Sequence, residues 1–465
     1  MGAKTRLTDT IQGAVRQAAP RGRSDRSVEA ALRATALCGR YRVLANDVQA
    51  YAQSVAAAYL EHDPASRAIL RRLDPEQDLG AAYRRNRDAL LEQLGPAAAV
   101  EDGFLSAFGL EVGARDRQES SEHAELFRVP EGSAATRRLP RDAKLRAGAY
   151  RTFALQSTPT FCEASQTRAT GSFRAAADLF QREAVLARRA DPSLFPYHLC
   201  SSYYPNVYLG IRQAVDLDSL RYAIDQLGGR GAAAKRRHYL AALLHAASVT
   251  TSATSHFCQP RGLVRDAEVL AVLQRRSVSI PSRVLAFSDA IRATCEAADP
   301  QPGSRANCAD WRGLYASGGI DDIDVVYADP PYTADNYSRF YHVLEVLTRY
   351  DYPELQVSRG KTTKGRYPVI GVRHQSPFCH KRALCAETAA RGSALVLSYA
   401  EENGLWFKVQ AERGLKPADA REGFLDLARA AYRDVRLETQ GLLHSGQGDS
   451  NHQVTELLLI ARRPR

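Results

Sequence analysis

Long apolar runs are missing from this chain of 465 residues. No window approaches the run of about 18 apolar residues that a membrane-spanning helix needs, so we expect no membrane contact. The first residues, which include Lys4 and Arg6, also lack an apolar stretch of the secretory type. We therefore expect no secretory signal and a cytoplasmic location. The remaining composition, with 45% hydrophobic and 25% charged residues, is ordinary for a globular protein.

Closely spaced cysteine pairs are missing as well. The eight cysteines are scattered along the chain, and none forms a C-x-x-C pair. Structural zinc sites need such closely spaced thiolates, and disulfide frameworks belong mainly to short secreted chains. We therefore predict no metal site and reduced cysteines.

Lysine is scarce, whereas arginine is abundant. Of the 63 basic residues only 8 are lysines, which leaves 55 arginines, and the formal net charge is +11. Arginine binds phosphate and guanine edges in a bidentate manner, which favours a polyanionic partner. A GC-rich genome would enrich arginine and alanine without any functional cause, so composition alone leaves both explanations open.

The hydrophobic pattern predicts an α/β fold with a large helical insertion. A short helix is expected over residues 11–19, a strand at 42–45 and a helix over 51–61. Residues 65–285 are mainly helical in pattern, whereas apolar strands return at 323–327, 394–399 and 455–461. Strands separated by segments of helix length indicate a mainly parallel sheet. We therefore expect a sheet domain built from residues 1–64 and 286–465, interrupted by a helical insertion over 65–285.

The strand predicted at 323–327 leads directly into Asp329-Pro330-Pro331-Tyr332. Two prolines end a strand because they lack the backbone N–H and fix an extended loop. Ligands bind beyond the carboxyl ends of strands in open α/β sheets. The Asp329 carboxylate and the Pro330 carbonyl can accept both hydrogens of an exocyclic amine, while the Tyr332 ring can stack on a base. We therefore predict an amine-binding site that consists of Asp329, Pro330, Pro331 and Tyr332.

This segment resembles motif IV of the D12 class of adenine-specific DNA methyltransferases, a family of bacterial modification and defence systems. The resemblance implies a Rossmann-like sheet that binds S-adenosylmethionine, with target recognition assigned to the helical insertion. It further implies methyl transfer to adenine N6 in double-stranded DNA, by base flipping, in association with restriction or defence proteins. Other planar amines, namely RNA adenine, a glutamine amide or cytosine N4, remain alternatives.

Three weaker motifs follow the order of the family. Residues 2–7 resemble the N-terminal G-x-K-x-x-L motif, which implies that Lys4 borders the methyl donor. Asp47 resembles the motif II acid that approaches the ribose, and Asp310 resembles the strand-end acid near the donor's adenine. Each of these acids could instead be a turn residue or a helix cap.

The family's glycine-rich motif I, D/E-x-F-x-G-x-G, is absent. It is expected between residues 19 and 42, where Ser27, Val28 and Glu29 stand in place of glycines. A Cβ atom at these positions would crowd a bound cofactor. A catalytically impaired, DNA-binding methyltransferase-like subunit is therefore an alternative to an active enzyme.

The segment that follows motif IV carries an excess of basic residues. Residues 355–386 contain no acid but seven cations and several glycines and prolines, so we predict a basic loop that contacts DNA phosphates. A solvated charged surface is the other interpretation. Tyr337 is a candidate wall of the base pocket, and Arg212 and Gln213 could either read base edges or link helices. The predicted DNA-binding residues are Tyr337, Arg359, Lys361, Lys364, Arg366 and Arg373.

Overall fold

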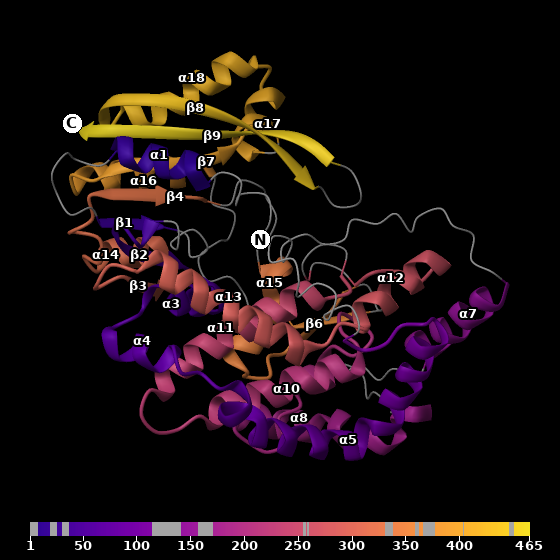
Figure 1. Cartoon of the computed structure of the whole chain (residues 1–465). Helices are drawn as coiled ribbons and strands as arrows, with labels where there is room; N and C mark the ends of the chain where they lie inside the picture. The colour runs from indigo at the N-terminus through magenta and orange to yellow at the C-terminus, as the bar shows by residue number, and fades with distance from the viewer. Residues whose placement is uncertain are drawn as a thin grey trace. The chain divides into compact units, whose positions relative to one another are not determined.

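The computed structural model describes most of the chain (Figure 1). The described residues are 8–18, 26–29, 37–113, 141–156, 171–253, 257, 260–330, 338–358, 362–365, 377–402, 404–445 and 451–465. They divide into two compact units. The first comprises Met1–Asp63, Ala293–Tyr337 and Val369–Arg465, and the second comprises Pro64–Arg292 and Ser338–Pro368.

The first unit contains a seven-stranded sheet in the order β3-β2-β1-β4-β7-β9-β8 (Figure 1). Neighbouring strands from β3 to β7 pair in parallel, whereas β9 pairs antiparallel with both β7 and β8. The α/β fold predicted from the sequence is thus observed. The strands are β1 (Arg26–Glu29), β2 (Arg42–Asp47), β3 (Arg305–Cys308), β4 (Val325–Ala328), β7 (Ala394–Ala400), β8 (Tyr432–Ser445) and β9 (Asn451–Pro464).

Helices cover both faces of this sheet. Successive side chains of a strand point to opposite faces. On β7, Leu395, Leu397 and Tyr399 pack with the helices that follow β4, while Val396 points to the other face and is equally buried. The helices of this unit are α1 (Thr8–Ala18), α3 (Ala50–Leu60), α14 (Trp311–Ala316), α16 (Pro377–Ala390), α17 (Leu405–Glu412) and α18 (Pro417–Arg429). A strand with two buried faces reads as a continuous apolar run, which is why β4 and β7 could be predicted from the sequence.

The second unit is mainly helical. Its helices are α4 (Pro64–Leu70), α5 (Pro75–Ala107), α7 (Arg141–Gln156), the 3-10 helix η2 (Gly171–Phe180), α8 (Arg182–Ala190), α9 (Leu199–Tyr203), α10 (Ile211–Gln226), α11 (Ala232–Thr250), α12 (Asp266–Arg276) and α15 (Ser338–Arg349), with most of α13 (Ile280–Ala298). Its strands are β5 (Leu355–Ser358) and β6 (Thr362–Gly365), which form an antiparallel pair.

The sequence division at residue 286 placed residues 338–368 in the sheet domain, whereas the structure places them in the second unit. The physical reason is a buried network around Asp218 of α10. Its carboxylate accepts the backbone N–H groups of Cys200 and Ser201 at 2.8 Å each and the Tyr350 hydroxyl at 2.6 Å. Because Tyr350 directly follows α15, this network fastens the segment to the helical unit.

A buried ion pair links distant parts of the second unit. Arg276 of α12 lies 3.2 Å from Glu101 of α5, and both side chains are only 2% exposed. Glu101 also accepts the backbone N–H of Ile211 at 2.7 Å, and Arg276 further donates to Tyr150. Removing one partner of such a pair leaves an uncompensated buried charge.

Replacing Arg276 by methionine should therefore lower the free energy of unfolding by about 3–5 kcal/mol, as measured by urea denaturation of the helical circular dichroism signal. Arg265→Met is the matched control, because the Arg265 side chain is 78% exposed beside Glu268. This control should lose at most about 1 kcal/mol. Equal losses in the two variants would contradict the assigned role of the buried pair.

Candidate active site

The end of β4 is the centre of the candidate site. Val325, Val326 and Tyr327 are buried, and β4 pairs in parallel with β1 on one side and β7 on the other. Asp329 and Pro330 follow at the carboxyl end of the strand and are half-buried. Pro331, Tyr332 and Tyr337, which belong to the same predicted site, lie outside the described residues.

The strand order makes this end of the sheet a topological switch point. β1 lies between β2 and β4, so the strands that follow β1 in sequence are placed on opposite sides of it. In open α/β sheets the crevice beyond such a reversal is the usual place for a ligand. Asp329 and Pro330 therefore stand where the architecture favours binding.

Two further predicted residues, Asp47 and Asp310, lie together at the same edge of the sheet. Asp47 ends β2 and accepts the backbone N–H of Gln49 at 2.9 Å. Asp310 follows β3 and caps α14 by accepting the N–H of Arg312 at 2.9 Å. The backbone N–H of Ala309 donates to the Asp47 carbonyl at 3.1 Å, which holds the two strand ends together. The capping alternative considered for Asp310 is thus realised, and both carboxylates are half-buried.

Two asparagines brace the same edge. Asn46 pairs with Asn307 in the β2–β3 register, and the Asn307 side-chain amide donates to the Asn46 side-chain oxygen at 3.0 Å. The Asn46 amide nitrogen in turn donates to the Ala309 carbonyl at 3.0 Å. This bridging fixes the separation of the two chain segments that carry Asp47 and Asp310.

The structure corrects the position expected for motif I. The sequence predicts Ser27, Val28 and Glu29 at the glycine positions of the loop, but they belong to strand β1 inside the sheet. These residues form a strand and not a loop because β1 pairs in parallel with both β2 and β4. The residues that follow β1 in the sequence, 30–36, contain no glycine and lie outside the described residues, as does Lys4.

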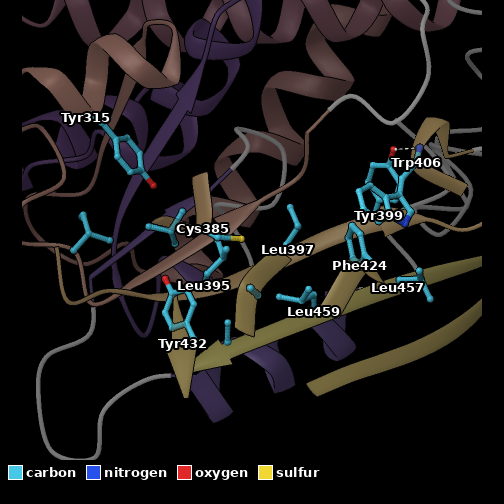
Figure 2. Close-up of a cluster of buried hydrophobic side chains, with 14 of the residues drawn as sticks. Tyr315, Cys385, Leu395, Leu397, Tyr399, Trp406, Phe424, Tyr432, Leu457 and Leu459 are labelled. Atoms are coloured by element: carbon cyan, nitrogen blue, oxygen red, sulfur yellow. Dashed lines mark hydrogen bonds between the residues drawn. The ribbon is translucent and has the colours of Figure 1, made fainter. Parts of the chain in front are cut away.

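The carboxyl end of β7 is built around Tyr399. Its hydroxyl accepts the backbone N–H of Trp406 at 3.1 Å, and its ring lies 5.4 Å from that of Phe424 in a stacked arrangement (Figure 2). A Cβ atom at Gly404 would lie only 2.5 Å from the Tyr399 ring and 2.1 Å from the Ala400 carbonyl oxygen. The ring of Tyr399 is therefore held in one position at this edge.

Lys381 lies on this ring. Its Nζ atom is 3.9 Å from the ring centroid of Tyr399, and the residue is only 3% exposed. Burial lowers the pKa of Lys381 to about 7. The sequence predicts Lys381 within the basic loop of residues 355–386. The structure corrects this prediction, because Lys381 belongs to α16. Lys381 and the buried residues Cys385 and Thr388 are spaced i, i+4, i+7, which is the pattern of a buried helix face. This spacing is the sequence feature from which the burial of Lys381 could have been predicted.

The predicted basic loop is partly regular structure. β5 and β6 form a hairpin with Val357 opposite Thr363, and α16 begins at Pro377. β-Branched residues on either side of Gly360 favour such a hairpin. Lys364 lies in β6, whereas Arg359, Lys361, Arg366 and Arg373 lie outside the described residues.

Arg212 and Gln213 serve the packing of the second unit. Arg212 forms a bidentate pair with Asp102, with Nε at 2.7 and 2.8 Å from the two carboxylate oxygens. Gln213 is buried, accepts the N–H of Gly210 at 3.0 Å and donates to the carbonyl of Arg275 at 2.8 Å. The helix-linking interpretation of both residues is therefore the one that the structure supports.

The described part of the chain holds neither a metal-binding cluster nor a membrane-spanning helix. Within the described ranges, no three histidine, cysteine, aspartate or glutamate side chains gather closely enough to hold a metal ion. Each helix in those ranges is also too short or too polar to cross a bilayer.

Two curated proteins share short segments with this chain. Modification methylase LlaI of Lactococcus lactis subsp. lactis is 48% identical over 44 residues, which cover 10% of this chain and 7% of that protein. Type II methyltransferase M.FokI of Planomicrobium okeanokoites is 41% identical over 59 residues, or 13% of this chain and 8% of that protein. The matched segments thus span less than a tenth of either relative. No solved structure matches the chain.

A family model matches the part of the chain that holds the candidate site. Its 64 matched residues run from before β4 to the first turns of α16. Residues 318–381 match the D12 class N6 adenine-specific DNA methyltransferases, which confirms the resemblance predicted from Asp329-Pro330-Pro331-Tyr332.

Proposed function

We propose that this protein transfers a methyl group from S-adenosylmethionine to adenine N6 in double-stranded DNA. The observation that carries this proposal is the position of Asp329 and Pro330, which lie within the matched family segment and at the switch point of the sheet. The sheet order, with parallel strands on both sides of β1, supports a Rossmann-like methyltransferase fold.

The residues at the end of β4 suit the chemistry of an amine. The Asp329 carboxylate and the Pro330 carbonyl would accept the two N6 hydrogens, which directs the nitrogen lone pair toward the methyl group. S-adenosylmethionine supplies this methyl group in electrophilic form when it is bound. As the N6–carbon bond forms, the methyl–sulfur bond breaks, and the amine then releases one proton to water.

The two acids at the β2 and β3 ends fit the donor. Carboxylates accept hydrogen bonds from hydroxyl and amino groups, so Asp47 would bind the ribose and Asp310 the adenine of S-adenosylmethionine. We assign Lys4 to the border of the same site on the family resemblance. The lack of glycine in residues 30–36, directly after β1, favours the alternative of an impaired DNA-binding subunit, whereas the intact Asp329 favours the enzyme.

The target adenine must leave the base stack to reach the proposed site. A target adenine inside a duplex cannot reach a strand-end pocket, so the base would be extruded at a cost of a few kcal/mol. Stacking on Tyr332 would recover about 1–3 kcal/mol. Tyr337 would wall the pocket, and the cations from Arg359 to Arg373 would contact phosphates. Restriction or phage-defence proteins are the proposed partners, in keeping with the names of the two relatives.

Asp329→Ala should abolish most methyl transfer, because the amine loses the carboxylate that orients it. We expect the rate of N6-methyladenine formation in plasmid DNA, measured by mass spectrometry, to fall by about 10²–10³-fold. Asp419→Asn, which alters an exposed carboxylate in the first turn of α18, should retain full activity. Full activity in Asp329→Ala would refute the proposed mechanism.

Asp47→Ala and Asp310→Ala should each weaken donor binding. Loss of a hydrogen bond to a charged group corresponds to about 10–100-fold in affinity, which calorimetry with S-adenosylmethionine can measure. Asp434→Ala on β8 is the control, since Asp434 pairs with Arg462 rather than lying at the carboxyl edge. A folded wild-type protein that binds no donor would instead support the DNA-binding subunit.

Neutralising the basic segment should reduce the salt dependence of DNA binding. Each phosphate contact contributes about 0.9 to the slope of log K against log salt concentration. Arg359→Gln, Lys361→Gln and Arg366→Gln together should therefore lower that slope by about 2–3 in fluorescence anisotropy titrations. A triple variant with the wild-type slope would remove the phosphate-contact assignment.

A further inference from the structure

The amine of Lys381 is buried without a hydrogen-bond partner among the described residues. An ammonium or amine group held away from water normally carries a large free-energy penalty unless it is paired. Contact with the ring of Tyr399 compensates only part of this loss, because an aromatic face attracts a cation but accepts no conventional hydrogen bond. Within the part of the chain that the structure describes, Lys381 Nζ therefore has no hydrogen-bond partner.

The register of the sheet places this amine beside the candidate site. β4 and β7 pair in parallel up to Ala328 opposite Leu397. Two residues further along each chain are Pro330 and Tyr399, so the ring under Lys381 lies level with the carbonyl proposed to accept an N6 hydrogen. Adjacent strands are about 4.8 Å apart. Lys381 of α16 thus lies over the end of β7, the strand next to the one that leads into Asp329.

An adenine held at this place presents acceptors on both sides of its amino group. N1 and N7 flank the exocyclic N6, and extrusion from the duplex deprives N1 of its base-pairing partner. Asp329 and Pro330 are acceptors and cannot satisfy either ring nitrogen. A donor that lies over the end of the neighbouring strand β7 would complete the set of contacts.

We propose that Lys381 is a specificity-determining residue that donates a hydrogen bond from Nζ to N1 or N7 of the extruded adenine. This inference rests on the proposed function. A neutral ring nitrogen suits the position better than a phosphate does. Lys381 sits among Tyr399, Cys385 and other buried residues of the sheet core, where a second full charge would be costly. The next residue of α16, Arg382, is exposed to solvent.

Base analogues can test the contact directly once the methylated site has been mapped on plasmid DNA. Duplexes would carry adenine, 1-deazaadenine, 7-deazaadenine or 3-deazaadenine at the target position. We expect either the 1-deaza or the 7-deaza substitution to lower kcat/KM of the wild type by roughly 10–100-fold. The same analogue should cause no further loss in Lys381→Met, which has already lost the donor. The 3-deaza substitution, on the far side of the ring from N6, should affect both proteins equally.

A stability measurement separates this role from a structural one. The folded protein holds the pKa of Lys381 at about 7, below the ordinary value of 10.5. Between these values the unfolded chain binds a proton that the folded chain releases, so burial of Lys381 costs most below pH 7 and progressively less toward pH 10.5. Lys381→Met should therefore raise the melting temperature at pH 6–7, with a gain that shrinks as the pH rises. A residue kept for packing would instead lower the melting temperature when replaced.

The outcomes are distinguishable. Arg382→Met, one residue further along α16, should match the wild type with every analogue. If the wild type methylates adenine but responds to all analogues as Lys381→Met does, the hydrogen bond is refuted while the proposed function stands. If the wild type methylates no DNA, both the proposed function and this inference are overturned.

Discussion

Parallel pairing of β4 with β1 and β7 is the constraint on which the candidate site depends. Parallel strands bring their carboxyl ends to one edge, so residues from distant parts of the sequence become neighbours there. Asp47 and Asp310 are more than 260 positions apart, and the register of β2 with β3 brings them to the same edge. Proline at 330 and 331 then ends β4 where this edge begins.

The edge combines rigid and polar elements. Tyr399 is fixed by its hydrogen bond with Trp406 and by the close approach of Gly404, and asparagines join the ends of β2 and β3. A site held in this way would orient an amine without rearrangement, as the proposed methyl transfer requires. The buried amine of Lys381 belongs to this edge although it lies in a helix.

The sequence predicted the elements that follow simple patterns. The strands β4 and β7 and residues 457–461 of β9 are apolar runs, because both faces of the sheet are covered there. The position of Asp329 at a strand end followed from the same pattern. β1 was missed since Arg26–Glu29 is short and polar, and only its pairing with two neighbours makes it a strand. The hairpin of β5 and β6 was missed because glycine and proline around it favour loops.

The sequence by itself therefore determined the α/β character and the strand that leads into Asp329-Pro330. Its cysteine spacing also argued against a zinc site. Tertiary structure decided which polar residues gather, because that depends on register and helix packing rather than on sequence distance. Arg212 and Gln213 have side chains suited to reading bases, yet their partners Asp102 and Arg275 lie more than 60 residues away and engage them in packing. Lys381 differs in the opposite sense: its sequence surroundings suggest a surface charge, and the packing of α16 on β7 buries it at the edge of the site.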